Sequence, residues 1–230
     1  MTNSPECREQ IPAEPFAVTK RLSRELVEGT GIDGVGVAVF ASEATRDLVF
    51  ATDSVAEELD EMQFTLGEGP CLDAFRFHRP ELHDDIVSGE ALARWPAFSA
   101  QSAALGAASV YAYPLAEEGG APFGVLELYG RLPVSLSAQE EASCRLFAAS
   151  IGRAVLSELA PVHALISRPD DGVFRRGNVN VAAGMLAVQL QVSVEEALVR
   201  LRARAFSRQR RITAIAGDVI GDEEFDADAS

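Results

Sequence analysis

Cysteines and aromatic residues are scarce in this sequence of 230 residues. The three cysteines, Cys7, Cys71 and Cys144, form no C-x-x-C pair and leave an odd thiol, and aromatic residues make up 7% of the chain. A chain of this length buries enough surface to fold without cross-links, which excludes a small disulfide-stabilised module. The odd thiol favours a reducing compartment. The 47% of hydrophobic residues predicts one large or two small globular domains.

Long hydrophobic runs are also lacking. Residues 95–116 and 177–194 carry no charge, but the first range contains Pro96 and Pro114 and both contain several polar side chains. A membrane span needs about 20 predominantly apolar residues, so neither range is predicted to cross a membrane. The N-terminus shows no basic region followed by an apolar run, so no secretory signal is expected. We therefore expect a cytoplasmic protein without a membrane partner.

Basic residues are few outside one segment near the C-terminus. The net charge of −15 argues against a nucleic-acid partner, because phosphates repel an acidic surface. The charge is unevenly distributed: residues 1–172 hold 12 basic and 27 acidic residues, residues 173–217 hold eight arginines and two glutamates, and residues 218–230 hold six acids and no base. A basic module beside an acidic body keeps nucleic acid among the expected partners.

Residues 14–160 are predicted to form an α+β domain, an antiparallel sheet flanked by helices. The pattern predicts a first helix over 14–29 and a final helix that starts at a Ser137–Glu140 capping box and ends at Pro161. The predicted hairpins join residues 34–41 with 47–52 and residues 109–116 with 121–130. The apolar stripe of the final helix is longer than one sheet needs, which predicts a homodimer. Its members are Leu146, Phe147, Ile151, Val155 and Leu159.

The C-terminal part is predicted to be all-α. Residues 161–176, rich in proline, glycine and aspartate, form the predicted linker. Residues 177–221 show three helical patterns, which predict a three-helix bundle, and the acidic residues 222–230 are expected to be a disordered tail. The expected inner faces are Val181, Ala182, Met185 and Val188 in the first helix, Val194, Ala197, Leu198, Leu201 and Ala205 in the second, and Ile212, Ile215, Ala216 and Val219 in the third.

Four segments resemble the GAF sensor domains of actinobacterial proteins that end in an ANTAR domain. They are LGEGPCLDA (66–74), RWPAF (94–98), YAYPL (111–115) and GVLELY (124–129). The C-terminal part resembles that ANTAR domain in its A-x-G at 182–184, its EEAL-x-x-LR at 195–202, and the pairs Ala205–Phe206 and Ile215–Ala216. The resemblance implies a GAF-like sheet domain followed by an ANTAR-like bundle, in a transcription antiterminator that binds RNA hairpins in nascent leaders and prevents a terminator from forming.

Six arginines on the second helix and the turn after it are the candidate RNA-binding residues. They are Arg200, Arg202, Arg204, Arg208, Arg210 and Arg211. A guanidinium offers phosphate a forked set of donors and a permanent charge; the alternative is a solvated helix face. Ala183 stands at a position that is often Lys or Thr in the family, so an RNA contact is expected to be lost there. The family's core motif falls on Ala182, Gly184, Ala197, Leu201 and Ala205, with a close crossing where Gly184 meets Ala197.

The sensor domain offers three candidate residues for an unknown small-molecule or redox input. Cys71 stands at a loop-to-helix junction, which favours a reactive thiolate, although a small buried residue is the more common role of a free cysteine. Trp95 and Phe98 line a ligand pocket or anchor a helix on the sheet. His78, His83, Asp84 and Asp85 fit no standard metal site, and no metal or other cofactor is predicted.

No catalytic arrangement stands out, so we do not expect an enzyme. Two alternatives to the RNA-binding hypothesis remain open. The first is a thiol-dependent reductase resembling the GAF-fold free methionine sulfoxide reductases, with Cys71 as nucleophile. The second is a protein-interaction regulator whose arginines contact an acidic partner instead of RNA.

Overall fold

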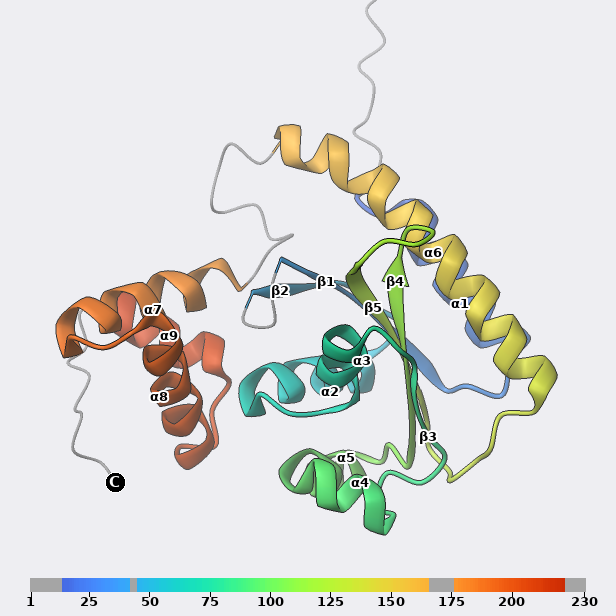
Figure 1. Cartoon of the computed structure of the whole chain (residues 1–230), viewed down its shortest axis with the longest axis horizontal. Coiled ribbons are helices and arrows are strands. Elements are labelled where there is room, and N and C mark those ends of the chain that lie inside the picture. Colours follow the sequence, from blue (N-terminus) through green and yellow to red (C-terminus); the bar gives the residue numbers. More distant parts are fainter. Residues whose placement is uncertain (1–13, 42–44, 166–175, 222–230) are drawn as a thin grey trace, which may run out of the picture.

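The computed structural model describes residues 14–41, 45–165 and 176–221. Within these ranges the chain forms a sheet domain flanked by helices and a separate bundle of three helices (Figure 1). The α+β class predicted from the sequence is confirmed. Cys7, most of the predicted linker and the acidic tail lie outside the described residues.

The sheet is antiparallel and has five strands in the order β2-β1-β5-β4-β3. Both predicted hairpins are confirmed, and β1 pairs with β5 at the centre, where Val37 lies opposite Leu126. Gly124 is required in β5 because a Cβ atom there would lie 2.6 Å from the carbonyl oxygen of Ala38. The strands are β1 (Gly34–Phe40), β2 (Arg46–Ala51), β3 (Glu81–His83), β4 (Ser109–Ala116) and β5 (Pro122–Gly130).

Helices cover both faces of this sheet (Figure 1). One face is covered by α1 (Ala17–Gly29) and α6 (Ala138–Leu165), whose Leu26 and Ile151 are buried against the apolar side chains of the central strands. The helices of the other face are α2 (Ser54–Leu66), α3 (Pro70–Phe77), α4 (Gly89–Arg94) and α5 (Pro96–Leu105). Among the described helices none by itself has the length and hydropathy of a membrane span.

Helix α6 begins as predicted and ends later. Ser137 and Glu140 form the capping box, with Ser137 N donating to Glu140 Oε2 at 2.8 Å and Glu140 N donating to Ser137 Oγ at 3.3 Å. The helix continues through Pro161 to Leu165, so the predicted end at Pro161 and the start of the linker there are wrong. Proline lacks the N–H of the hydrogen-bond ladder and its ring crowds the carbonyl four residues earlier, but the good helix formers Ala160, Ala164 and Leu165 on either side of it in the sequence favour continuation of the helix.

The apolar stripe of α6 is largely used within the chain. Ile151 and Val155 are fully buried against the sheet, and Phe147 and Leu159 pack at the edge of the same cluster. Leu146, in contrast, is 71% exposed. The length of the stripe therefore does not require a second copy of the chain. The homodimer stays a prediction, and the surface of α6 that could form it is the outer face with Leu146.

The bundle consists of α7 (Gly177–Leu190), α8 (Val194–Ser207) and α9 (Ile212–Ile220). Ser193 caps α8 by accepting a 3.1 Å hydrogen bond from Glu196 N. The predicted inner residues of α9 are all buried, and those of α8 are buried except Val194, which is exposed. The three core-motif positions on α8, Ala197, Leu201 and Ala205, are fully buried as predicted.

The predicted inner face of α7 is partly wrong. Val181 is exposed and Val188 is 80% exposed, whereas Ala182 is buried as expected. The other buried residues of α7 are Val179, Ala183 and Leu186. The helix is apolar on most sides, so its hydrophobic residues show no clear helical period that would identify the buried face. The buried face is the one with the small alanines, which let the neighbouring helices approach closely.

Gly184 does not lie at a helix crossing. A Cβ atom at this position would have no neighbouring atom within 4 Å, so the predicted close contact with Ala197 is wrong. The close approach is made by Ala182 and Ala183, which belong to the same buried cluster as Ala197. Ala183 is thus a core residue of the bundle. The loss of an RNA contact at this position stays a prediction.

Candidate nucleic-acid interface

The six candidate arginines do not form one continuous face. Arg204, Arg208 and Arg210 surround Asp218, whose pKa is lowered first by its hydrogen bond to Arg210 and then by the charges of Arg210, Arg208 and Arg204. Arg210 reaches the two oxygens of this carboxylate at 2.6 and 3.2 Å. Arg200, which precedes Arg204 by one helical turn, bonds Glu196 at 3.0 Å. These four arginines, 200, 204, 208 and 210, are called the outer arginines below.

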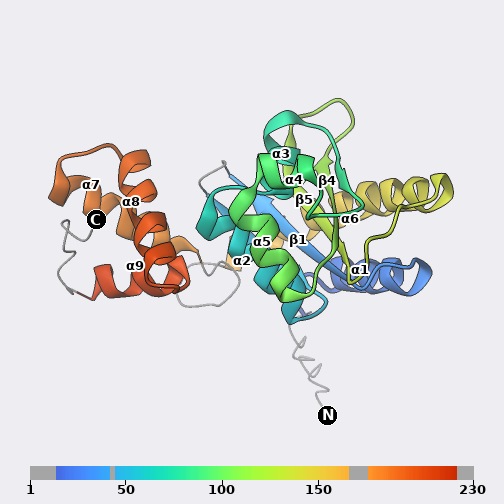
Figure 2. The same ribbon diagram turned by 90° about the horizontal axis from the view of Figure 1, so that it is seen from below.

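The other two arginines are directed at helix α2 of the sheet domain. Arg202 donates from Nε to the carbonyl oxygen of Phe64 at 3.2 Å, at the C-terminal end of α2. Arg211 forms ion pairs with Glu57, at 3.8 Å, and with Glu58 in the first turns of the same helix. The predicted RNA-binding set is therefore divided between the outer arginines and this contact between the domains. Figure 2 shows the bundle beside the sheet domain, on the side where α2 lies.

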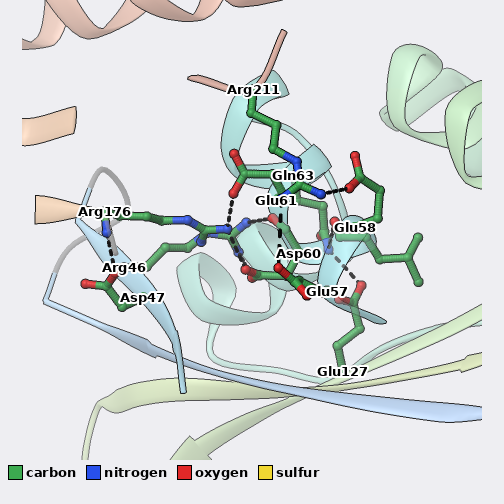
Figure 3. Close-up of polar contacts among 11 residues, drawn as sticks. Arg46, Asp47, Glu57, Glu58, Asp60, Glu61, Gln63, Glu127, Arg176 and Arg211 are labelled. Carbon is green, nitrogen blue, oxygen red and sulfur yellow. Dashed lines mark hydrogen bonds and ion pairs between the residues drawn. The ribbon is translucent and has the colours of Figure 1, made fainter. Parts of the chain in front are cut away.

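A third arginine of this contact, Arg176, was missed in the sequence because it ends the predicted linker. Its backbone N–H donates to Asp47 Oδ1 at 2.9 Å, and its Nη2 donates to Asp60 Oδ2 at 2.7 Å and to Glu61 Oε2 at 2.8 Å (Figure 3). The guanidinium also lies 4.2 Å from the centre of the Phe64 ring. Two features of the sequence could have revealed this contact. Four of the five residues at 57–61 are acidic, and the basic residues are densest in residues 173–217.

Asp60 is a buried carboxylate shared by two arginines. Arg176 approaches it from the bundle, and Arg46 of β2 lies with Nη1 3.4 Å from Asp60 Oδ1. Burial alone would raise the pKa of Asp60, but the two guanidinium groups hold it below its usual value. The pKa of Glu61 is raised, because burial outweighs its single bond to Arg176. The contact thus contains one carboxylate, Asp60, whose charge two arginines stabilise, and a second, Glu61, whose charge a single arginine compensates only in part.

The opposite side of α2 is bonded to the interior of the sheet domain. Gln63 donates from Nε2 to Glu127 Oε1 at 2.7 Å and accepts from the backbone N–H of Cys71 at 2.8 Å. Gly69 has φ of 136°, and a Cβ atom there would lie 2.5 Å from Gln63, so glycine is required beside this side chain. Burial raises the pKa of Glu127 to about 7. The G-E-G-P-C motif is therefore a turn built around Gln63.

The three candidate sensor residues are packed in the core and do not line one pocket. Trp95 and Phe98 belong to one buried cluster and Cys71 belongs to another. Trp95 donates from Nε1 to Asp73 at 3.1 Å, and the N–H of Phe98 donates to Glu68 at 2.9 Å, so these contacts anchor α4 and α5. Two grooves, of about 590 and 670 Å³, lie instead beside α2 where it meets the bundle, and none of the three residues lines them.

Cys71 has the properties of a structural cysteine. Its side chain is buried, and burial together with the charge of Glu127 raises the pKa of the thiol well above its usual value. A reactive cysteine needs an accessible, readily formed thiolate. Cys144 is buried in the cluster on the opposite face of the sheet. The geometry gives no support to a redox role for Cys71.

The sheet domain matches a known family and known structures. A family model described as "GAF domain" matches residues 16–155. Similar solved structures are the GAF domain region of a protein from Geobacter sulfurreducens PCA, a domain of a two-component sensor histidine kinase protein from Sinorhizobium meliloti 1021, and the GAF domain of a phosphoenolpyruvate-protein phosphotransferase from Coxiella burnetii. No curated protein matches the sequence.

These structural matches share the fold and are distant in sequence. The identities are 15%, 15% and 17%, and the TM-score is 0.51 in each case. The matches cover 61%, 65% and 66% of this chain and 91%, 96% and 89% of the respective structures. The likeness therefore concerns the fold of the sheet domain, and the matched family range ends before the C-terminal bundle begins.

Proposed function

We propose, from the premise that this chain belongs to the GAF domain family, that its sheet domain is a sensor which controls RNA binding by the C-terminal bundle. The function that fits both parts is transcription antitermination, in which the bundle binds RNA hairpins in nascent leaders. The sequence resemblance of residues 177–221 to ANTAR domains supports this assignment of the bundle.

The observation that carries the proposal is the position of the outer arginines. They lie on the turns of α8 and the segment after it, away from the bundle core, on a chain that is otherwise strongly acidic. Their carboxylate partners, Glu196 and Asp218, are solvent-accessible, and exposed ion pairs of this kind contribute little to stability. RNA phosphates can therefore replace these carboxylates at small cost.

The test is RNA binding by the full chain as a function of salt. A labelled RNA with two small-looped hairpins is titrated with the parent protein and with the Arg204→Gln/Arg208→Gln variant. Each phosphate contact on single-stranded RNA contributes about −0.7 to the slope of log affinity against log salt, so four outer arginines predict at most about −3 per bundle and the variant a shallower slope. The control, Arg79→Gln/Arg131→Gln, removes the same charge at two exposed positions of the sheet domain outside α6 and should leave binding unchanged.

Binding that does not depend on salt, or no binding to any hairpin RNA, rejects the proposal. Preferential capture of an acidic protein by the same arginines would favour the protein-interaction alternative. We propose no enzymatic activity, because the reductase alternative requires a reactive thiolate and the thiol of Cys71 is buried with a raised pKa.

A further inference from the structure

Helix α2 is contacted by bundle arginines along its whole length. Arg211 meets the carboxylates of its first turns, Arg176 meets Asp60 and Glu61 in its middle, and Arg202 meets the Phe64 carbonyl at its C-terminal end. The Arg202 guanidinium also lies against Gly67, the residue that ends the helix. A Cβ atom added to this glycine would lie 3.1 Å from Arg202 Nη1. A cation at a helix C-terminus is favoured by the helix dipole.

The acceptors on α2 have the chemistry of an RNA backbone. A carboxylate, like a phosphate, offers several negatively charged oxygens to the fork of a guanidinium. Glu57 and Glu58 present such oxygens to Arg211, and the carbonyl oxygen of Phe64, in the last turn of the helix, presents partial negative charge to Arg202. Two of the six arginines expected to bind RNA are therefore already occupied by groups that resemble its phosphates.

We infer that helix α2 is a competitor of RNA built into the chain: the sensor domain holds Arg202 and Arg211, and RNA that uses these arginines must displace α2. This inference rests on the proposed RNA-binding function and concerns its regulation. The outer arginines provide first contact with RNA, and release of α2 extends the basic surface by two residues.

The contact is divided into a part that exchanges easily and a part that does not. Side chains of Glu57, Glu58 and Arg211 are 42, 37 and 51% exposed, so water screens their ion pairs. The bonds of Arg176 to Asp60 and Glu61 are buried, and breaking them would leave unpaired charges inside the protein. RNA is therefore expected to compete at the Arg211 end of α2, while Arg176 keeps the two domains attached.

The same helix can transmit a signal from the sensor interior. Its outer side carries Glu57 and Glu58, and its inner side carries Gln63, which is bonded to Glu127 of the central strand and to the backbone of Cys71. A change in the interior that displaces Gln63 also displaces α2. The protein then has two states, one with α2 bound to Arg211 and one with α2 released. An input that binds one of these states more tightly changes the fraction of molecules in which Arg211 can bind RNA.

The experiment reverses the charge of the competitor in the full chain. The Glu57→Lys/Glu58→Lys variant repels Arg211, and the competition predicts that it binds the two-hairpin RNA about three- to tenfold more tightly than the parent. The matched control is Glu117→Lys/Glu118→Lys, which makes the same charge change at adjacent glutamates in the exposed turn between β4 and β5. Its affinity shows how much is gained from net charge alone.

Three outcomes separate this inference from the proposed function. A gain for the α2 variant well above that of the control supports the competition. Equal affinities of the two lysine variants overturn the competition and leave the RNA-binding function intact. Failure of all three proteins to bind hairpin RNA at low salt overturns both.

A second measurement follows the domain contact without RNA. Spin labels attached at Ala93→Cys on α4 and Val188→Cys on α7, in a chain that also carries Cys7→Ser, report the distance between the domains in double electron–electron resonance. Both positions are exposed, and the two other native cysteines are buried. Because Arg176 still joins the two domains in the α2 variant, its distance distribution should broaden without separation of the domains, and that of the control should stay unchanged. An unchanged distribution in both would show that Glu57 and Glu58 do not hold the bundle.

Discussion

Gln63 of α2 and Glu127 of β5, 64 positions apart in the sequence, are joined by a 2.7 Å hydrogen bond inside the sensor domain. Burial raises the pKa of Glu127 to about 7, so the folded protein holds this carboxyl protonated at pH values where the unfolded chain has released the proton. A raised carboxyl pKa in the folded state gives stability that is complete below about pH 4.5 and lost as the pH rises to about 7.

Replacement of Glu127 by glutamine should remove this pH dependence. Glutamine keeps an acceptor for Gln63 and carries no charge, so the free energy of unfolding of Glu127→Gln should exceed that of the parent increasingly between about pH 4.5 and 7, by up to about 3 kcal/mol. Urea denaturation at a series of pH values measures the difference. The lowered pKa of Asp60 contributes stability that is lost in the opposite direction, as the pH falls. Asp60 is present in both proteins, so this contribution cancels in the comparison. A difference that does not change with pH would show that Glu127 titrates normally.

Removal of Arg176 should destabilise the chain strongly. The Arg176→Met variant leaves Glu61 without its buried partner and Asp60 with Arg46 alone, which predicts a loss of about 3–5 kcal/mol in the free energy of unfolding. The control is Arg131→Met, whose exposed pair with Asp33 at 3.7 Å predicts a loss of less than about 1 kcal/mol. Equal losses for the two variants, measured by denaturant unfolding, would contradict the buried pairing.

Two adjacent residues of α7 should respond oppositely to added side-chain volume. Ala183 is packed in the bundle core, so Ala183→Leu should cost about 1–3 kcal/mol of stability. Gly184 has open space around its Cα atom, so Gly184→Ala should stabilise the helix by about 0.5–1 kcal/mol. Thermal melting of the two variants tests the pair, and a destabilising Gly184→Ala would restore the close crossing expected from the sequence.

The homodimer predicted from the sequence should use the outer face of α6. The exposed positions Ala142, Leu146, Ala149 and Arg153 recur at spacings of four and three residues, which places them on one stripe. Leu146→Glu should shift the protein to monomer in light scattering without loss of folding, because the side chain is 71% exposed. Leu132→Glu, at a residue that is 72% exposed outside this helix, should have no effect. A monomeric parent protein would disprove the dimer.

The acidic tail should weaken RNA binding at low salt. Arg204, Arg208 and Arg210 already surround Asp218, and the tail continues from α9 just after this residue with five further acids. A chain ending at Gly221 should bind hairpin RNA more tightly than the full chain at low salt. The two affinities should converge at high salt, where screening suppresses both the tail and the phosphates. Identical affinities at every salt concentration would show that the tail does not compete.

The sequence alone determined the elements that depend on local chemistry. Both hairpins follow from runs of β-branched and aromatic residues separated by polar turns, and the starts of α6 and α8 follow from the hydroxyls of Ser137 and Ser193. Regular apolar spacing likewise predicted the buried faces of α8, apart from Val194, and of α9. These features are decided within a few residues, so a single sequence contains the information.

Only the tertiary structure decided which residues meet across the chain. Arg176 and Asp60 are 116 positions apart, and any of several acids could have paired with this arginine until the domains were placed together. The inner face of α7 was decided by how closely its alanines allow α8 and α9 to approach, because the helix is apolar on most sides. The division of the arginines has the same origin: charge clustering shows that a segment is basic, but the fold selects which guanidinium groups face α2 and which face solvent.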